Sequence, residues 1–262
     1  MKIQEVANVL ERVAPRNLQE DYDNAGFIVG NPSNDVTGVL CCLDSTEDVL
    51  EEAIQKGCNL IIAHHPIIFR GLKSITGQTY VERVIIKAIQ NNITIYAIHT
   101  NLDNVLIDGV NAKIAQKLGL EVKHILKPTA ESPNIGAGLI AHLNATMKEI
   151  DFLRHIMQVL ECRCIKHTQL LDKAVQKVAI CGGSGQFLLP FAIQSGADIY
   201  ITADFKYHDY FDADNQIVVA DVGHYESEQF TAELLCNIIT ENFSTFAAYI
   251  SETITNPIKY LV

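Results

Sequence analysis

Apolar and polar residues follow two rhythms along this chain, one typical of helices and one typical of buried strands. Apolar residues recur at helical spacing from Ile3 to Val13, which predicts an amphipathic helix that ends before Pro15. Short apolar runs such as Val39–Leu43 and Leu60–Ala63 are instead typical of buried strands. Because helical segments and apolar runs alternate, the pattern predicts an α/β fold with mostly parallel sheets flanked by helices.

The alternation of helical segments and apolar runs is weaker around residues 120–135, a polar stretch that contains prolines. This change predicts a domain boundary. We therefore expect two similar α/β domains. The first would comprise residues 1–125 with 223–262, and the second would comprise residues 126–222.

One internal similarity supports the expectation that the domains resemble each other. The segment Ala53–Ile62 aligns without gaps with Ala192–Ile201, and each reads as a helix end, a glycine and an apolar strand. The alignment places Asp204 at the strand end that corresponds to His65. A duplication would explain the match, and so would the ordinary sequence pattern of α/β proteins.

Two adjacent histidines, His64 and His65, directly follow the apolar run Leu60–Ala63, and Pro66 ends the strand. In open α/β sheets, ligands bind at the carboxyl ends of the strands. Neutral imidazole is the commonest metal ligand, so the pair predicts a metal site at this edge. The alternative is a pair of core histidines, although two buried imidazoles leave several ring nitrogens to satisfy.

Further ligand types follow two other predicted strands. Asp103 lies beyond the apolar run Ile93–Ile98, where a carboxylate is also typical of a helix or turn cap. Its position at the same sheet edge as two histidines favours a metal ligand. His224 and Glu228 begin the helix after a later strand, and their spacing of four places both side chains on one helix face.

Together these residues supply nitrogen and oxygen ligands and no thiolate: His64, His65, Asp103, His224 and Glu228. Such a set favours divalent ions with a catalytic rather than a structural role, and Zn, Fe and Mn all accept it. We expect two divalent ions per chain. The two carboxylates would leave about two positive charges on such a pair, which favours an anionic small-molecule substrate.

Composition narrows the classes of partner. The net charge of −11 over 262 residues argues against a broad nucleic-acid surface. No apolar run reaches the roughly 18 residues that a membrane span needs. The seven cysteines show no framework spacing, which indicates reduced thiols and a cytoplasmic location.

Several motifs carry a resemblance to a known family across nearly the whole chain. They are Asp23–Gly26, His64–Phe69, His99–Asp103, Asp204–His208 and Gly223–Glu228. In these motifs the chain resembles the NIF3-like family, whose members are known as GTP cyclohydrolase 1 type 2 homologues. The resemblance implies a dinuclear metal site between the two domains, held by the five ligands above, and a toroidal homohexamer. The chain looks like the short form, which lacks the inserted middle domain of some members.

The chain departs from the family pattern at Ala63 and Ala203, where Thr and Gly are expected. Neither position is a ligand in the family, so the departures concern the surroundings of the metal site.

Two alternatives for function follow. The first is a dinuclear, metal-dependent hydrolase acting on a phosphorylated or nucleotide-like small molecule, with His99, Asp204 and His208 as candidate catalytic proton donors. The second is a non-catalytic metal-binding protein that serves regulation or metal delivery. Nothing in the sequence identifies a guanine pocket, so at this point it is open whether the chain is an enzyme.

Overall fold

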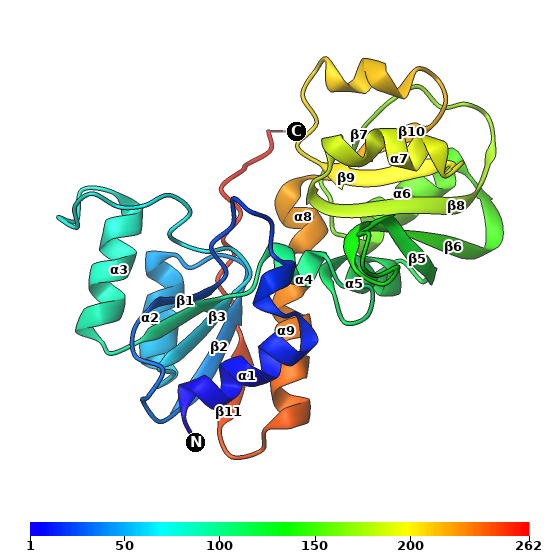
Figure 1. The fold of residues 1–262 in the computed structure, drawn as a ribbon. Coiled ribbons are helices and arrows are strands. Elements are labelled where there is room, and N and C mark those ends of the chain that lie inside the picture. The colour runs from blue at the N-terminus through cyan, green and yellow to red at the C-terminus, as the bar shows by residue number, and fades with distance from the viewer. Residues whose placement is uncertain (262) are drawn as a thin grey trace. The chain divides into compact units, whose positions relative to one another are not determined.

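The chain forms two compact units in the computed structural model, which describes residues 1–261 (Figure 1). The first unit comprises Met1–Leu102 and Thr231–Lys259. The second comprises Asp103–Phe230, together with Tyr260 and Leu261. In each unit a sheet carries helices on its faces, which confirms the predicted α/β class.

A mixed sheet forms the centre of the first unit, with the strand order β1-β4-β3-β2-β11. Strands β11, β2, β3 and β4 pair in parallel, whereas β1 runs antiparallel to β4. The strands are β1 (Gly26–Val29), β2 (Gly38–Cys42), β3 (Leu60–Ala63), β4 (Thr94–Ala97) and β11 (Ala247–Ile250). The helices are α1 (Ile3–Val13), α2 (Glu47–Gln55), α3 (Tyr80–Gln90) and α9 (Thr231–Asn242), with the 3₁₀ turn η1 (Arg16–Leu18).

One face of this sheet is covered by α2 and α3. Leu40, Ile61 and Ile95 lie on that face, one on each of three neighbouring strands. Leu50 from α2 and Val84 from α3 pack into the same hydrophobic core. All five side chains are fully buried, so this core is a principal source of the stability of the unit.

The opposite face carries α1 and α9. Tyr96 in β4 donates a hydrogen bond from its hydroxyl to Glu11 Oε1 of α1, at 3.0 Å. Cys41 in β2 forms a thiol hydrogen bond with Cys236 of α9. Because both faces are covered, the central strands are continuous apolar runs, which is why the sequence reveals them clearly.

A mixed sheet also forms the centre of the second unit, with the order β5-β6-β8-β9-β10-β7. Strands β8, β9 and β10 pair in parallel, whereas the pairs β5–β6, β6–β8 and β10–β7 are antiparallel. The strands are β5 (Glu121–Pro128), β6 (Gly136–Lys148), β7 (Lys166–His167), β8 (Ala174–Ser184), β9 (Ile199–Ala203) and β10 (Val218–Asp221). The helices are α5 (Val110–Lys117), α6 (Glu149–Val159), α7 (Leu189–Gln194) and α8 (His224–Glu228), with the 3₁₀ turns η2 (Gln186–Leu188) and η3 (Asp209–Ala213). Helix α4 (Thr100–Asp103) ends at the residue where the second unit begins.

The prediction of mostly parallel sheets is therefore wrong for the second unit. The polar stretch that suggested a domain boundary contains the edge strand β5, which pairs with β6 as an antiparallel hairpin. Only Ile125 and Leu126 are buried within β5, and its other side chains are partly or fully exposed. A strand with so few apolar positions gives no clear strand signal in the sequence.

The compact units also differ from the predicted domains in their boundaries. The first unit ends before Asp103 rather than at residue 125, because α5 packs on β8 of the second unit. This packing is close: a Cβ added at Gly182 in β8 would lie 3.0 Å from Ile114 and 3.1 Å from Val110. Whether the units are independent domains stays a prediction.

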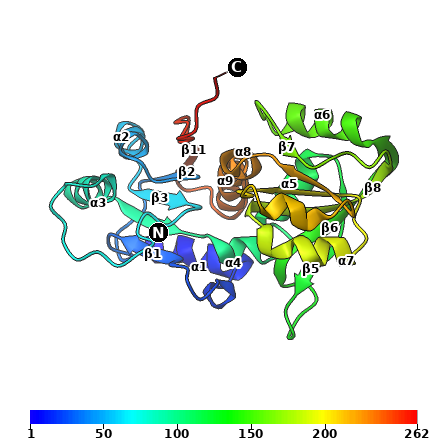
Figure 2. The ribbon, with the colours of Figure 1, turned by 90° about the horizontal axis from the view of Figure 1, so that it is seen from above.

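Figure 2 shows α6 and α7 on opposite faces of the second sheet. On the α7 face, Leu189 and Ala192 pack with Ile140, Tyr200 and Val219 from the strands. The sheet is thus buried on this side by a short helix and by η3.

Among residues 1–261, none of the helices combines the length and apolar character that crossing a membrane requires.

The repeated sequence segment adopts the same local structure in both units. Gly57 follows α2 with a φ of 68°, and the amide after it donates a hydrogen bond to Ala53 O at 2.8 Å. Gly196 follows α7 with a φ of 70°, and the next amide donates to Ala192 O at 3.3 Å. This left-handed conformation favours glycine, ends each helix and directs the chain into a parallel strand.

The core of the first unit gives a test of the fold. Leu50→Ala removes a fully buried side chain from α2, so it should lower the free energy of unfolding by about 2–5 kcal/mol. Ile54→Ala on the same helix is the matched control, because Ile54 is 36% exposed and should cost less. Urea denaturation followed by circular dichroism measures both; equal losses would contradict the assignment of the core.

Candidate metal centre

Polar residues of the first unit gather at the carboxyl ends of three neighbouring parallel strands. Asp44 follows β2, His64 and His65 follow β3, and His99 follows β4. Because parallel neighbours end at the same edge of a sheet, these side chains meet there. The amides of His64 and His65 donate to carbonyls at the end of β2, at 3.1 and 2.9 Å, so the sheet still holds both residues.

The two adjacent imidazoles are each held through Nδ1. His64 Nδ1 lies 2.9 Å from the carbonyl oxygen of Ile98, and His65 Nδ1 lies 2.7 Å from Asp44 Oδ1. Since a carbonyl oxygen can only accept, His64 Nδ1 carries the proton and donates it. In a neutral imidazole the lone pair then lies on Nε2, which makes Nε2 the atom that can bind a metal.

Asp44 holds the predicted ligand His65, a role that was not predicted from the sequence. Burial acts to raise the pKa of Asp44, but the hydrogen bonds from His65 and from Thr255 outweigh it, so the pKa is lowered. Thr255 Oγ1 donates to Asp44 Oδ2 at 2.6 Å. Asp44 is thereby kept ionised, and it fixes the tautomer and orientation of His65.

His99 is held in the same manner by a different carboxylate. Asp23 precedes β1, whose start pairs with the end of β4, and its Oδ1 lies 2.8 Å from His99 Nδ1. Thr100 donates to Asp23 through its amide, at 3.0 Å, and through its hydroxyl. Burial raises the pKa of Asp23, but His99 and Thr100 together lower it to about 2.

These bonds bring the imidazoles of the first unit into one cluster. One ring nitrogen from each of His64, His65 and His99 lies within 4.8 Å of the others. The ring of Phe69 lies against His99, with 5.9 Å between ring centroids. Three imidazoles in this arrangement are a donor group suited to a transition metal or zinc.

In the second unit, the parallel strands β9 and β10 place Asp204 and His224 side by side. Asp204 directly follows β9, and Gly223 turns the chain from β10 into α8 with a φ of 94°. Asp204 Oδ2 lies 2.7 Å from His224 Nδ1. His224 is therefore the third predicted metal ligand whose Nδ1 is held by a carbonyl or a carboxylate, as expected of a histidine that binds a metal through Nε2.

The carboxylate of Glu228 lies next to His224, and the carboxylate of Asp103 lies next to that of Glu228. Glu228, only 3% exposed, places Oε2 3.0 Å from His224 Nε2, one helical turn away as predicted. A carboxylate oxygen of Asp103 lies within 4.8 Å of one from Glu228. Burial acts to lower the pKa of His224, but Asp204 and Glu228 raise it to about 11. Such surroundings favour a positive charge, whether a proton or a metal ion.

Gly183 in β8 leaves the space that the ligands of the second unit occupy. A Cβ added there would lie 2.4 Å from Glu228 Oε1 and 3.3 Å from His224 Cε1. The φ of Gly183 is 63°, a conformation that side chains other than glycine rarely adopt. Gly183 thus makes room for the carboxylate of Glu228.

The donor groups in both units fit a divalent metal. Imidazole nitrogens and carboxylate oxygens are the ligands that Zn, Fe and Mn share, and the carboxylates and the carbonyl that orient the histidines are in place. The predicted residues His64 and His65 meet in the first unit, and Asp103, His224 and Glu228 meet in the second. The candidate proton donor His99 joins the first group.

The other two candidate proton donors have different surroundings. Asp204 is engaged with His224, whose hydrogen bond lowers the pKa of Asp204. His208 is exposed, and its ring contacts Tyr207 and Phe211. Asp23 and Asp44 are partners of histidine that were not predicted. Only their position beside strand ends could have indicated them.

Comparisons with known proteins agree with this architecture. A profile of the Duf34/NIF3 (NGG1p interacting factor 3) family matches residues 1–257. A GTP cyclohydrolase 1 type 2 homolog from Clostridium acetobutylicum is 36% identical over 230 residues, which cover 87% of this chain and 85% of the relative. Its counterpart from Lactococcus lactis is 32% identical over 262 residues, with 98% of both chains covered.

Solved structures give the same result for the fold. The Staphylococcus aureus hypothetical protein SA1388 aligns with a TM-score of 0.89 at 30% identity and covers 100% of this chain and 99% of its own. A Bacillus cereus protein related to NIF3 aligns with a TM-score of 0.91 at 26% identity, with the same coverage.

The bond between Asp23 and His99 generates a prediction about acid stability. Asp23→Asn should lower the free energy of unfolding near pH 7 by about 1–2 kcal/mol, because a charge-assisted hydrogen bond is lost. The folded-state pKa of about 2 lies below the ordinary 3.8, so this stabilisation is present above pH 3.8 and disappears as the pH falls toward 2. The difference between wild type and variant should therefore narrow over that range.

Urea denaturation at a series of pH values between 7 and 3 measures this difference. Asp21→Asn is the matched control, because Asp21 is exposed and lies two residues away. A constant difference at all pH values would mean that the charge of Asp23 does not contribute.

Proposed function

This chain belongs to the Duf34/NIF3 family, and we propose that it is a metal-dependent hydrolase that acts on a phosphorylated or nucleotide-like small molecule. The observation that carries the proposal is the way its histidines are held. His64, His65 and His224 each engage Nδ1 with a carbonyl or a carboxylate, which fixes the ring in the orientation expected of a histidine that binds a metal through Nε2. Histidines that only filled a core would not need this common orientation.

We further propose, from the membership of the family, that the chain holds two divalent ions through the five predicted ligands, which are His64, His65, Asp103, His224 and Glu228. Their imidazole nitrogens and carboxylate oxygens are ligands that such ions accept. Such ions, when bound, supply Lewis acidity and activate water.

The substrate class follows from charge and from the relatives. Two divalent ions against the carboxylates of Asp103 and Glu228 leave about two positive charges, which favours an anionic substrate. The relatives carry the name GTP cyclohydrolase 1 type 2 homolog, which is consistent with a nucleotide-like molecule. Zn, Fe and Mn all remain compatible with the donors.

The candidate catalytic residues take different roles in this proposal. His99 is oriented by Asp23 and lies in the imidazole cluster, so it would give a proton to the leaving group. Asp204 accepts the Nδ1 proton of His224, which favours an orienting role. His208 would act only if the substrate reached its exposed ring.

Metal binding is tested by a substitution that keeps the shape of a ligand. Asp103→Asn should weaken metal binding more than about tenfold, because the amide lacks the negative charge. The fold should survive, since Asn111 donates to the backbone oxygen of Asp103, at 3.1 Å, and not to its carboxylate. Elemental analysis after reconstitution with Zn, Fe or Mn should give two equivalents for wild type.

Asp108→Asn is the matched control for this experiment. Asp108 is exposed and has a φ of 56°, which asparagine tolerates. It should keep the wild-type metal content. Equal metal content in Asp103→Asn and wild type would contradict the proposed ligand set.

Catalysis is distinguished from metal storage or delivery by turnover. The metal-loaded protein should hydrolyse a member of a panel of phosphoesters, nucleotides and cyclic amides. His99→Ala should keep most of the metal and lose at least about tenfold in kcat, because general acid catalysis contributes that much or more. Full metal occupancy without turnover on any substrate would favour the alternative, a regulatory or metal-delivery protein.

We also propose that the chain assembles into a homohexamer, which rests on its membership of the family. Light scattering on the purified protein should then give a mass near six times 29.0 kDa. A particle of 29.0 kDa at working concentration would contradict this assembly.

A further inference from the structure

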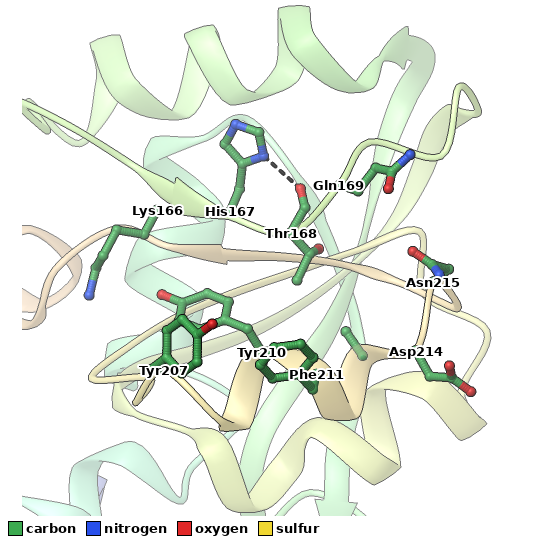
Figure 3. A pocket seen from close by; sticks show the side chains of 10 residues that line it. Lys166, His167, Thr168, Gln169, Tyr207, Tyr210, Phe211, Asp214 and Asn215 are labelled. Carbon is green, nitrogen blue, oxygen red and sulfur yellow. Dashed lines mark hydrogen bonds between the residues drawn. The ribbon is translucent and has the colours of Figure 1, made fainter.

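A pocket of about 520 Å³ lies in the second unit (Figure 3). None of the five predicted metal ligands lines it. Figure 3 shows it between the segment Lys166–Gln169, which includes the edge strand β7, and the rings carried by η3 and the loop before it. All of its lining residues belong to the second unit. The volume lies within the range of small-molecule sites, which is roughly 300–1,000 Å³.

One wall of the pocket is aromatic and open to solvent. Tyr207 is 74% exposed and Phe211 66% exposed, and their ring centroids lie 5.6 Å apart at an interplanar angle of 72°. Tyr210 lines the same wall. Tyr207 and Phe211 contribute little to the core, since their rings lie mainly in water. Large exposed rings gathered at a concave site are typical of surfaces that bind a flat, apolar group.

Tyr210 and the cation of the pocket are fixed by one buried carboxylate. Asp221 is 1% exposed, and its Oδ2 accepts from Tyr210 Oη at 3.0 Å and from Lys166 Nζ at 2.7 Å. Tyr210 is packed edge-on against Phe205, with 5.4 Å between ring centroids. Tyr210 is therefore held in place before a ligand binds, which reduces the entropy lost on binding.

The remaining polar groups suit a heteroaromatic ring rather than a plain hydrocarbon. Besides His167 and Thr168, the pocket is lined by Gln169 and Asn215, whose carboxamides can donate and accept hydrogen bonds at the edge of a ring. The charges do not favour an anion inside the pocket, because Lys166 is neutralised by Asp221 and because Asp214 adds a negative charge. The group that binds here is therefore flat and uncharged.

The position of the pocket relates it to the ligands of the second unit. The loop Asp204–His208 holds His224 at its first residue, through the 2.7 Å bond to Asp204, and lines the pocket with Tyr207. Lys166 at the edge of the pocket pairs with Asp221, which ends β10 three residues before His224. A molecule with its ring in the pocket can thus extend toward His224.

We propose that this pocket binds a planar heteroaromatic ring, of the size of a purine nucleoside, as the part of the substrate that is recognised but does not react. This inference rests on the proposed function for the identity of the reacting part. The pocket itself is tested without metal or turnover.

The probe is 2-aminopurine riboside 5′-monophosphate, whose fluorescence is quenched when its ring stacks on an aromatic side chain. It should bind saturably to the purified protein, and ribose 5-phosphate, which lacks the ring, should not displace it. The double variant Tyr207→Ala/Phe211→Ala should bind at least about tenfold more weakly, because stacking on an aromatic ring generally contributes that much. Phe187→Ala is the matched control, because Phe187 is 51% exposed in the same unit and does not line the pocket.

Three outcomes would overturn the proposal: no saturable quenching, equal affinity of the double variant and wild type, or displacement of the probe by ribose 5-phosphate. Thermal unfolding and metal content of the double variant should match wild type, since both rings are exposed and neither is a ligand. If wild type does not quench the probe and the double variant changes its particle mass, the two rings would instead be assigned to contact between copies of the chain. Asp103→Asn separates the two proposals. If this variant loses metal but still binds the probe, the pocket is supported independently of the metal centre.

Discussion

Parallel pairing of neighbouring strands is the constraint on which the rest of the structure depends. Strands that run side by side in one direction end at one edge, so residues far apart in the chain are brought together there. In the first unit this places His64 and His65 beside His99. In the second it places Asp204 beside His224. The glycines that end α2 and α7 set up this pairing, because each reverses the chain just before a parallel strand.

The histidines also need fixed ring orientations, which come from hydrogen bonds to carboxylates and to one carbonyl. Asp44 and Asp23 hold their imidazoles in the first unit, and Asp204 does so in the second. Hydrogen bonds keep the pKa of each carboxyl below its ordinary value despite burial. Around His224, the carboxylates of Asp204 and Glu228 raise the pKa of the imidazole to about 11 despite burial, so the surroundings favour a positive charge at this ring.

Much of this arrangement could be predicted from the sequence, because the residues that make it follow apolar runs. His64 and His65 stand directly after a strand, and His224 and Glu228 share one helix face through their spacing. The partners Asp23 and Asp44 could not be found in this way, since their role depends on which strands are neighbours. The strand β5 was also missed, because an exposed edge strand lacks the run of apolar residues that buried strands show.

The aromatic pocket lay outside the reach of the sequence for a similar reason. Tyr207 belongs to the motif Asp204–His208, whereas Lys166 and Gln169 on the other side of the pocket lie far from it in the chain. Their meeting depends on the antiparallel pairing of the short strand β7 with β10, which no periodic pattern indicates.

The loop Asp204–His208 gives the second unit a thermodynamic property of its own. The same five residues orient His224 at one end and present Tyr207 at the other, and Phe205 between them is anchored by its amide to Asp221 Oδ2 at 3.2 Å. Any molecule that stabilises one arrangement of this loop also changes how firmly His224 is held. Linkage then requires reciprocity: whatever factor a ring in the pocket adds to metal affinity, the metal adds to the affinity for the ring.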